Sequence, residues 1–348
     1  MPSTLRVRSA LPFAAVVLAA ALAGCAEPPP PAMAQQTAPP VTMSSRTIEL
    51  ASGYRAYMSR TGAISPAFAD GTAVASSVTT GAAYDPRQFL RGAIAYGAVV
   101  ALQDPTFVAG VRASANDRAQ RQEVAYAILR DPAYVAGLPG ASSAAGAIVA
   151  ALGTDGRALY DQGGRVKQAA YDIQASAWSK AEVPNRPMRL QQVKAAAAGP
   201  LMGDLAESQR LRLAATGALP ATPATPASPP YSSFVVRALG VAALAALGYD
   251  RDGQTDMVTP LMADAVGGTC LNLAKLNLYQ CLAVSKPHYE DVFCLGQHAM
   301  MDTGVCVMKS AGAALPLEVK TKPLDVSLTS KPYKAAPKPK ARPKAKTS

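Results

Sequence analysis

Four cysteines near one end of the 348-residue chain restrict its fold more than any other feature of the sequence. They are Cys270, Cys281, Cys294 and Cys306. The first two fall in residues 269–285, where leucines recur at helical spacing and helix breakers are few. In one α-helix Cys270 and Cys281 would lie about 16 Å apart, because each residue advances the helix by about 1.5 Å. Bridged cysteines need Cα atoms within about 7 Å, so these two cannot form a disulfide with each other.

The Lys-Pro-His turn at residues 286–288 predicts a helical hairpin whose second helix runs from residue 289 to about residue 302. Residues that face each other in an antiparallel hairpin are nearly equally distant from the turn. An even number of cysteines in an exported protein favours disulfides. We therefore predict two nested bridges in one register, each contributing about 2–4 kcal/mol to stability. These are Cys281–Cys294 on the inside and Cys270–Cys306 on the outside.

A zinc site is the alternative use of the same residues. Cys294 and His298 are four residues apart and share a helical face, while Cys281 would lie opposite them and His288 could be a fourth ligand. Zinc sites usually bring closely spaced ligand pairs from both sides, and this chain has one such pair. We therefore expect disulfides, no metal and no cofactor. His298 should pack or form a hydrogen bond at the hairpin surface, and His288 should lie in an exposed turn.

The N-terminus predicts export. Arg6 and Arg8 precede an apolar run, residues 10–24, which ends in small residues. This arrangement is typical of a secretory signal, and the run is too short for a membrane-spanning helix. Export to an oxidising space is also the condition under which the four cysteines would form stable bridges.

The end of this run, Leu22-Ala23-Gly24-Cys25, resembles the lipobox of bacterial lipoproteins. In that family the signal is cleaved before the cysteine, which then carries the lipid. The resemblance covers residues 1–25 and implies a lipid on Cys25. An Asp after the cysteine favours inner-membrane retention in the family; Ala26 stands there instead, which implies an outer-membrane anchor with the protein facing the periplasm. The alternative is an ordinary secreted protein cut after Ala32-Met33-Ala34.

Proline-rich runs divide the rest of the chain, because proline cannot continue a helix. They predict a linker after the lipidated cysteine, a second linker between two helical regions, and a tail. The predicted segments are the signal 1–24, the lipidated linker 25–45, the helical body 46–218, the Pro/Thr/Ala linker 219–232, the helical region 233–316 with the four cysteines, and the tail 317–348.

The formal charge of +11 is concentrated at the ends of the chain. Residues 320–348 hold nine basic residues and one acid, and the signal holds two arginines, which leaves +1 for the rest. Nucleic-acid binding by the folded part is therefore not expected. The tail is predicted to be disordered, and it either contacts peptidoglycan or lipopolysaccharide or serves only to keep the protein soluble. Its basic residues are Lys331, Lys334, Lys338, Lys340, Arg342, Lys344 and Lys346.

The body is predicted to be all-α, as a helical bundle or an irregular helical array. Asp-Pro pairs at Asp85, Asp104 and Asp131 each predict a helix start, with Asp as the N-cap and Pro at the first helical position. Residues 234–247 are apolar but too short to span a membrane, so we expect a buried core helix there. Residues 41–84 have no clear pattern and are expected to be partly loop.

A seven-residue repeat between residues 140 and 180 predicts a long helix with one face turned toward a partner. The Gly163-Gly164 pair allows a kink, and Trp178 is expected to be a packing residue. The expected partner helix lies in residues 188–215, interrupted at Gly199-Pro200. The apolar positions of the repeat are Leu152, Leu159, Val166 and Ile173, and a parallel stripe of small residues consists of Gly156, Gly163, Ala170 and Ala177.

The sequence contains none of the familiar nucleophile, zinc-protease, dinucleotide-binding or phosphate-loop motifs. Paired carboxylates that cleave glycans leave no local signature, and Glu290-Asp291 is most simply a pair of first-turn helix acids. We therefore expect a non-catalytic, lipid-anchored envelope protein with a structural, scaffolding or interaction role. The alternatives are a periplasmic enzyme that acts on glycan through carboxylates and a small-ligand-binding lipoprotein.

Overall fold

The computed structural model describes residues 41–221 and 223–316. The predicted signal, Cys25, the linker up to residue 40 and the basic tail lie outside the described residues. The described part is helical and contains no β-strand beyond two isolated bridges, which confirms the all-α prediction. Its helices are α1 Ser45–Gly62, α2 Gly71–Ala82, α3 Pro86–Leu102, α4 Pro105–Ala113, α5 Arg118–Arg130, α6 Ala141–Asp172, α7 Ala177–Lys180, α8 Arg186–Ala198, α9 Leu205–Ala215, α10 Ser233–Ala246, α11 Ala265–Val284, α12 His288–Cys294 and α13 Asp302–Ala311.

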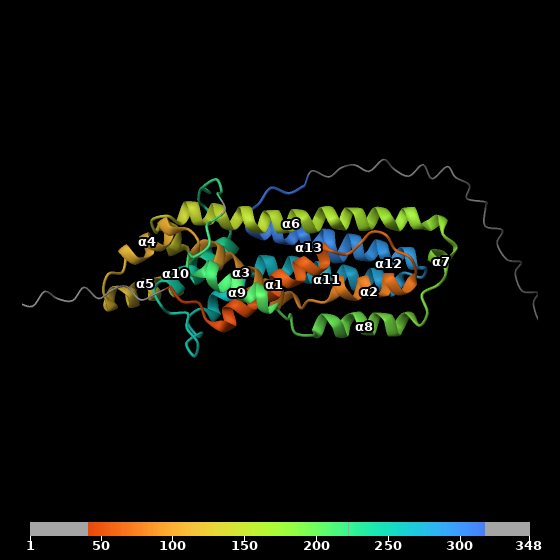
Figure 1. The fold of residues 1–348 in the computed structure, drawn as a ribbon, viewed down its shortest axis with the longest axis horizontal. Helices are drawn as coiled ribbons and strands as arrows, with labels where there is room; N and C mark the ends of the chain where they lie inside the picture. The colour runs from red at the N-terminus through yellow and green to blue at the C-terminus, as the bar shows by residue number, and fades with distance from the viewer. Residues whose placement is uncertain (1–40, 222, 317–348) are drawn as a thin grey trace, which may run out of the picture. The chain divides into compact units, whose positions relative to one another are not determined.

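Two long helical segments lie side by side along the bundle (Figure 1). One is α6, with 32 residues. The other is formed by α12, the π-helical segment η4 (Leu295–Met301) and α13, which follow one another without a break. The second arm of the predicted hairpin is therefore longer than expected, and it packs against α6 as well as against α11.

Glycines bring these two long segments close together. A Cβ atom on Gly163 would lie 2.8 Å from the carbonyl oxygen of Gly296, and one on Gly156 would lie 2.7 Å from that of Gly304. Both distances are shorter than real Cβ contacts, so the backbones can approach this closely only where side chains are absent. We call Gly156, Gly163, Gly296 and Gly304 the glycine seam.

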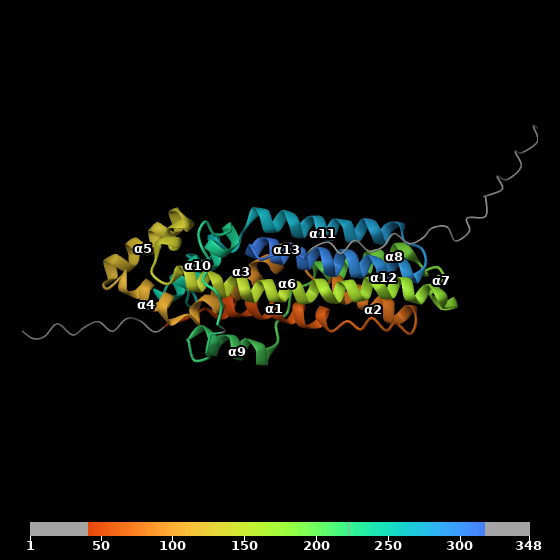
Figure 2. The same cartoon turned by 90° about the horizontal axis from the view of Figure 1, so that it is seen from above.

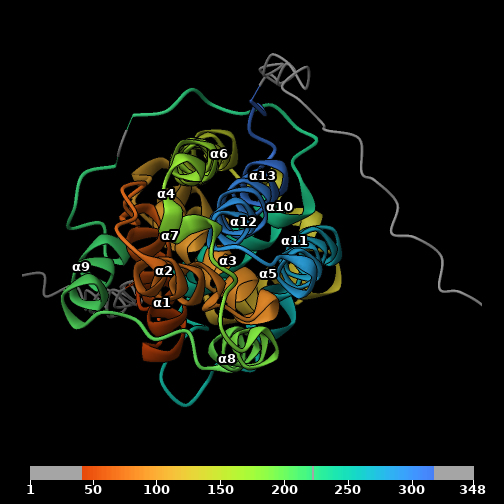
Figure 3. The ribbon, with the colours of Figure 1, turned by 90° about the vertical axis from the view of Figure 1, so that its right-hand side faces the viewer.

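The predicted partner of α6 was wrong. Leu152, Leu159 and Val166 of the apolar repeat are buried as expected, whereas Ile173 lies beyond the end of α6 and is partly buried. The helix packs against residues 288–311 rather than against residues 188–215. The latter form α8 and α9, broken at Gly199-Pro200 as predicted; α8 packs on α2 and α11, and α9 packs on α1 and α3 (Figure 3). The helix α6 also runs through Gly163-Gly164 without a break, because close packing along the seam outweighs the low helix propensity of glycine.

Residues 41–84 are more helical than expected. They form α1 and α2, whose N-termini are capped by the side chains of Ser44 and Asp70. Ile48 and Tyr54 of α1 are fully buried. The helical periodicity of apolar residues is weak in these two helices, because Ser, Thr, Gly and Ala fill many of the buried positions.

Two of the three Asp-Pro helix starts are confirmed. Asp85 and Asp104 are the N-caps of α3 and α4, and each accepts hydrogen bonds from two backbone N–H groups of the first turn. Asp131 caps a short 3-10 segment, Pro132–Gly137, instead of an α-helix. The local chemistry therefore sets where a helical turn begins, but not how far it continues.

The two sides of the 219–232 linker share one core. The apolar segment forms α10, which is buried against α3 and α6 as predicted, and the linker itself contacts α6 through hydrogen bonds between Ser142 and Ala227. Rings of Tyr54, Tyr57, Tyr84 and Phe89 meet beside α3 at centroid distances of 5.0–5.3 Å. Among the described helices none is singly long and apolar enough for a membrane span; α3 and α4 reach that composition only as a pair bent by 87°.

Lys275 of α11 is a buried amine in this core, with 5% of its surface exposed. Its Nζ donates a hydrogen bond to the carbonyl oxygen of Ala82 at 2.8 Å and lies 3.4 Å from the centre of the Tyr84 ring. Burial lowers the pKa of Lys275 to about 7, although the carboxylate of Asp85 favours the charged form. The Lys275 amine therefore binds its proton less tightly in the folded protein than in the unfolded chain.

Lys275 is expected to make stability rise with pH. Between about pH 7 and the ordinary lysine pKa of 10.5, the unfolded chain binds a proton at Lys275 that the folded chain releases. The wild type should therefore gain on the order of 2 kcal/mol between about pH 7 and about pH 9 relative to Lys275→Met, which does not titrate. Urea unfolding of both proteins across this range measures the difference; parallel stability profiles would contradict the assignment.

Candidate functional site

The four cysteines form the two predicted bridges. Cys270–Cys306 joins α11 to α13, and Cys281–Cys294 joins α11 to α12, with Cα atoms 5.6 and 5.7 Å apart. Both separations are normal for a disulfide. Two disulfides therefore join the two arms of the hairpin, one near the turn and one farther from it. The second arm also packs on α6 through the glycine seam.

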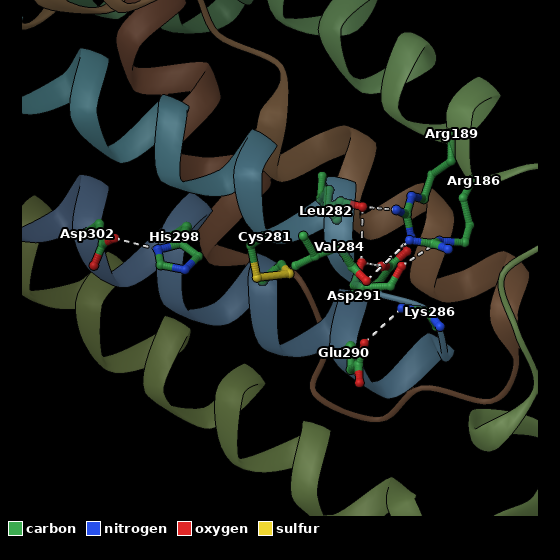
Figure 4. The surroundings of a disulfide bond; sticks show 12 residues. Arg186, Arg189, Cys281, Leu282, Val284, Lys286, Glu290, Asp291, His298 and Asp302 are labelled. Atoms are coloured by element: carbon green, nitrogen blue, oxygen red, sulfur yellow. Dashed lines mark hydrogen bonds and ion pairs between the residues drawn. A yellow bond between two sulfur atoms is a disulfide. The ribbon is translucent and has the colours of Figure 1, made fainter. Parts of the chain in front are cut away.

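An arginine of α8 holds the turn of the hairpin (Figure 4). Arg186 donates hydrogen bonds to three successive carbonyl oxygens, those of Ala283, Val284 and Ser285, over 2.7–3.2 Å. Carbonyls at the end of a helix have no intrahelical partner, and a cation there also complements the helix dipole. Arg186 therefore supplies the C-terminal cap of α11 from another part of the chain.

A second arginine of α8 forms a buried ion pair at the same place. Arg189 Nη1 lies 2.5 Å from Asp291 Oδ1, and both side chains are more than nine-tenths buried. Ser285 Oγ donates to the same carboxylate oxygen at 2.6 Å, and Arg189 Nη2 donates to the carbonyl oxygen of Leu282. Burial raises the pKa of Asp291, against the opposing effects of the Ser285 hydrogen bond and the Arg189 charge. We call Arg186, Arg189 and Asp291 the turn clamp.

The two adjacent acids of α12 have different roles. Both lie in its first turn, as predicted. Glu290 accepts a hydrogen bond from the backbone N–H of Lys286 at 2.8 Å, which is ordinary capping chemistry. Asp291 instead points at α8 and is buried. Local sequence does not distinguish the two, because the burial of Asp291 depends on α8, about 100 residues earlier in the chain.

His298 lies on the π-helical segment and forms a hydrogen bond, as predicted. Its Nδ1 is 2.8 Å from Asp302 Oδ2 (Figure 4). Cys281 and Cys294 are bonded to each other in the structure, so they are not free there to bind zinc together with His298. Among the described residues no group of three His, Cys, Asp or Glu side chains is placed to hold a metal ion.

The other histidine does not lie in an exposed turn, which corrects that expectation. His288 begins α12 and is half-buried. A Cβ on Gly71 of α2 would lie 2.3 Å from its ring, and the ring of Trp178 lies 6.2 Å away between centroids. The turn is covered because α2 and α7 pack over it. The sequence of the hairpin itself does not predict these two contacts.

A pocket of about 470 Å³ opens beside the Cys281–Cys294 bridge, between α6, α11 and α12. Its lining is rich in aromatic and aliphatic side chains, and Glu290 is the one carboxylate among the residues that line it. The pocket therefore offers apolar contact rather than acid–base chemistry. Its main apolar residues are Tyr171, Val284, Tyr289 and Phe293.

A second pocket, of about 480 Å³, lies between α6 and the group α1, α3 and α9. Arg55 Nη1 donates to both carboxylate oxygens of Asp155 at 2.6 and 2.8 Å, and the buried hydroxyl of Tyr54 donates to the same carboxylate at 3.1 Å. Arg210 forms a bidentate pair with Glu207, at 2.9 Å for both contacts. Arg55, Asp155 and Arg210, from three helices, thus line this pocket, and Glu207 is paired with Arg210 beside it.

Sequence reasoning missed this second site. Arg55 and Asp155 are 100 residues apart and belong to no motif. A weak signal was available, because Asp155 directly precedes Gly156 on the predicted small-residue face of a long helix. That pattern does not specify which cation would reach Asp155.

No protein-family model, curated protein or solved structure matches the chain.

Proposed function

We propose that the protein is a lipid-anchored component of the cell envelope with a structural, scaffolding or interaction role. The observation that carries this proposal is the doubly bridged hairpin of α11, α12 and α13. Disulfides of this kind persist in oxidising spaces such as the bacterial periplasm and are rare in reducing ones. Together with the lipobox-like sequence that ends at Cys25, they support export and anchoring.

In this proposal the lipid on Cys25 holds the protein at the outer membrane, facing the periplasm, and the helical bundle is the rigid part. The two bridges, the turn clamp and the glycine seam all restrain the second arm of the hairpin. The basic tail from Lys331 onward contacts anionic envelope polymers, either peptidoglycan or lipopolysaccharide. Eighteen residues in an extended polyproline-like form reach about 55 Å, at about 3.1 Å per residue.

The pocket lined by Asp155 does not favour the glycan-cleaving alternative. A glycosidase needs one carboxyl group that holds a proton and donates it to the leaving group. Asp155 and Glu207 both accept hydrogen bonds from arginines, so both carboxylates are engaged in ion pairs within the chain. A non-catalytic role is therefore the better match to these residues.

The proposal predicts that lipid attachment depends on Cys25. In cells fed radiolabelled palmitate, the wild-type protein should carry the label and pellet with membranes, and Cys25→Ser should carry none and be released from them. Peptide mass mapping should recover both bridges in the exported protein. A Cys25→Ser variant that still carries label, or bridge cysteines recovered as free thiols, would overturn the assignment.

The tail is tested separately with a chain that ends at Ser330. The full chain should sediment with purified sacculi if the tail contacts peptidoglycan, or with lipopolysaccharide vesicles if it contacts lipopolysaccharide. The shortened chain should lose that binding, and its helical circular dichroism should be unchanged. Binding that survives the deletion would show that the tail is not the contact.

A further inference from the structure

The 480 Å³ pocket between α6 and the group α1, α3 and α9 has the size of a small-molecule site, and like such sites it has an apolar wall and a polar side. Pockets of about 300–1,000 Å³ with an apolar wall and a few convergent polar groups are typical of such sites. Here the polar side carries Arg55 and Arg210, and the wall from α6 carries Ala147, Ala150 and Ala151. In Figure 2, α9 lies on the outside of the bundle next to α1. Its residues Arg210, Leu211 and Ala214 line one side of the pocket.

The guanidinium of Arg55 is fixed but not fully hydrogen-bonded. Its Nη1 is held by Asp155, and its Cζ lies 5.0 Å from the centre of the Tyr96 ring. Its Nε lies 3.5 Å from Glu207 Oε1, close enough for an ion pair but too far for a hydrogen bond. This Nε is buried and has no hydrogen-bond acceptor among the described residues. A buried Nε is not open to a ligand, but the Nη2 of Arg55 forms no hydrogen bond among the described residues and is the donor left for an acceptor from outside the chain.

The charges at the pocket limit what that partner can be. Arg55 and Arg210 balance Asp155 and Glu207, so the four groups together have no net charge. A ligand with two or more negative charges would be repelled by the two carboxylates. A single carboxylate matches the planar fork of a guanidinium and adds one charge only. Arg210 is 58% exposed at its side chain, and its Nη1 is not used in the pair with Glu207, so this nitrogen can donate to such a group.

We propose that this pocket binds a small monocarboxylate with an aliphatic body. The carboxylate accepts hydrogen bonds from Arg55 and Arg210, and the aliphatic part lies against the alanine wall of α6. Asp155 is a positioning residue, because it orients Arg55 and does not itself meet the ligand. This binding would add to the structural role proposed for the protein and does not depend on the lipid anchor.

Octanoate is the test compound, titrated calorimetrically into the chain carrying Cys25→Ser, which needs no detergent. We expect one saturable site, with octanol, which lacks the carboxylate, binding at least 10-fold more weakly. Arg55→Lys keeps a cation beside Asp155 but removes the guanidinium donors, and should weaken octanoate binding at least 10-fold. Arg91→Gln, an exposed arginine of α3 outside the pocket lining, is the matched control and should bind like the parent.

A second variant guards against a general loss of folding. Ala151→Leu fills the alanine wall and removes no charged group, and should weaken octanoate binding at least 10-fold while the thermal unfolding midpoint stays within a few degrees. Octanol that binds as well as octanoate, or Arg55→Lys and Ala151→Leu that bind like the parent, would overturn the proposal. Absence of octanoate binding at millimolar concentration would overturn it as well.

Discussion

Replacing Gly163 with alanine is expected to lower the free energy of unfolding by about 2–3 kcal/mol, although alanine is the better helix former. The added Cβ would lie 2.8 Å from the carbonyl oxygen of Gly296 and 2.8 Å from the Cβ of Met300. Both neighbours belong to the continuous second arm of the hairpin, which is tied to α11 by two disulfides and cannot easily move away. The extra methyl group therefore has to separate two long helical segments.

Gly164 is the matched control, because it is the next residue of the same helix. A Cβ there meets nothing within 4 Å. Gly164→Ala should therefore show the propensity gain alone and raise stability by up to about 1 kcal/mol. Gly304→Ala tests the seam from the opposite side, since its Cβ would lie 2.6 Å from the carbonyl oxygen of Gly156. Urea unfolding with the disulfides intact gives the free energy of unfolding of all three variants. If Gly163→Ala raised it as Gly164→Ala does, the two helical segments would have moved apart at little cost, which would contradict the prediction.

Replacing Arg189 with methionine is expected to cost about 3–5 kcal/mol, because it leaves the carboxylate of Asp291 buried without its cation. The pair is nearly inaccessible to water, with side-chain exposures of 7% and 2%. The substitution also removes the donor to the carbonyl oxygen of Leu282. The exposed Arg87 of α3 is a suitable control, and Arg87→Met should change stability by less than about 0.5 kcal/mol.

The cause of the Arg189 effect can be tested by removing the charge it balances. The double variant Arg189→Met, Asp291→Asn should recover a large part of the loss, because no buried charge remains. The single variant should also lose less stability near pH 4 than near pH 7, since a proton then neutralises Asp291, whose pKa burial already raises. A loss that is independent of pH and not relieved in the double variant would mean that lost packing is the cause.

The disulfide pairing could be predicted because it depends on one local element. A hairpin has a single free parameter, the position of its turn, and the turn at 286–288 fixes which cysteines face each other. The Asp caps at Asp85 and Asp104 were predictable for a similar reason, because a cap uses the side chain and backbone of residues a few positions apart. The same locality explains the error at Asp131, where the turn begins as expected and then stops.

The tertiary contacts were not predictable in the same way. The repeat of α6 showed which face would be buried but not what would cover it, and the nearest later helices, α8 and α9, were the wrong choice. Lys275, Asp291 and Arg55 looked like ordinary charged residues in the sequence. Each has unusual chemistry only because a segment at least 100 residues away covers or opposes it.

The sequence by itself determined the helical class, the core helix α10, the register of the hairpin and the two bridges. The roles of the signal-like N-terminus and of the basic tail remain predictions. The tertiary structure decided that the hairpin packs on α6 through glycines, that α8 clamps its turn, and that two arginines and one carboxylate line a pocket. The physical reason is range: caps, turns and helical periodicity act over a few residues, whereas burial and ion pairing depend on which distant surfaces meet.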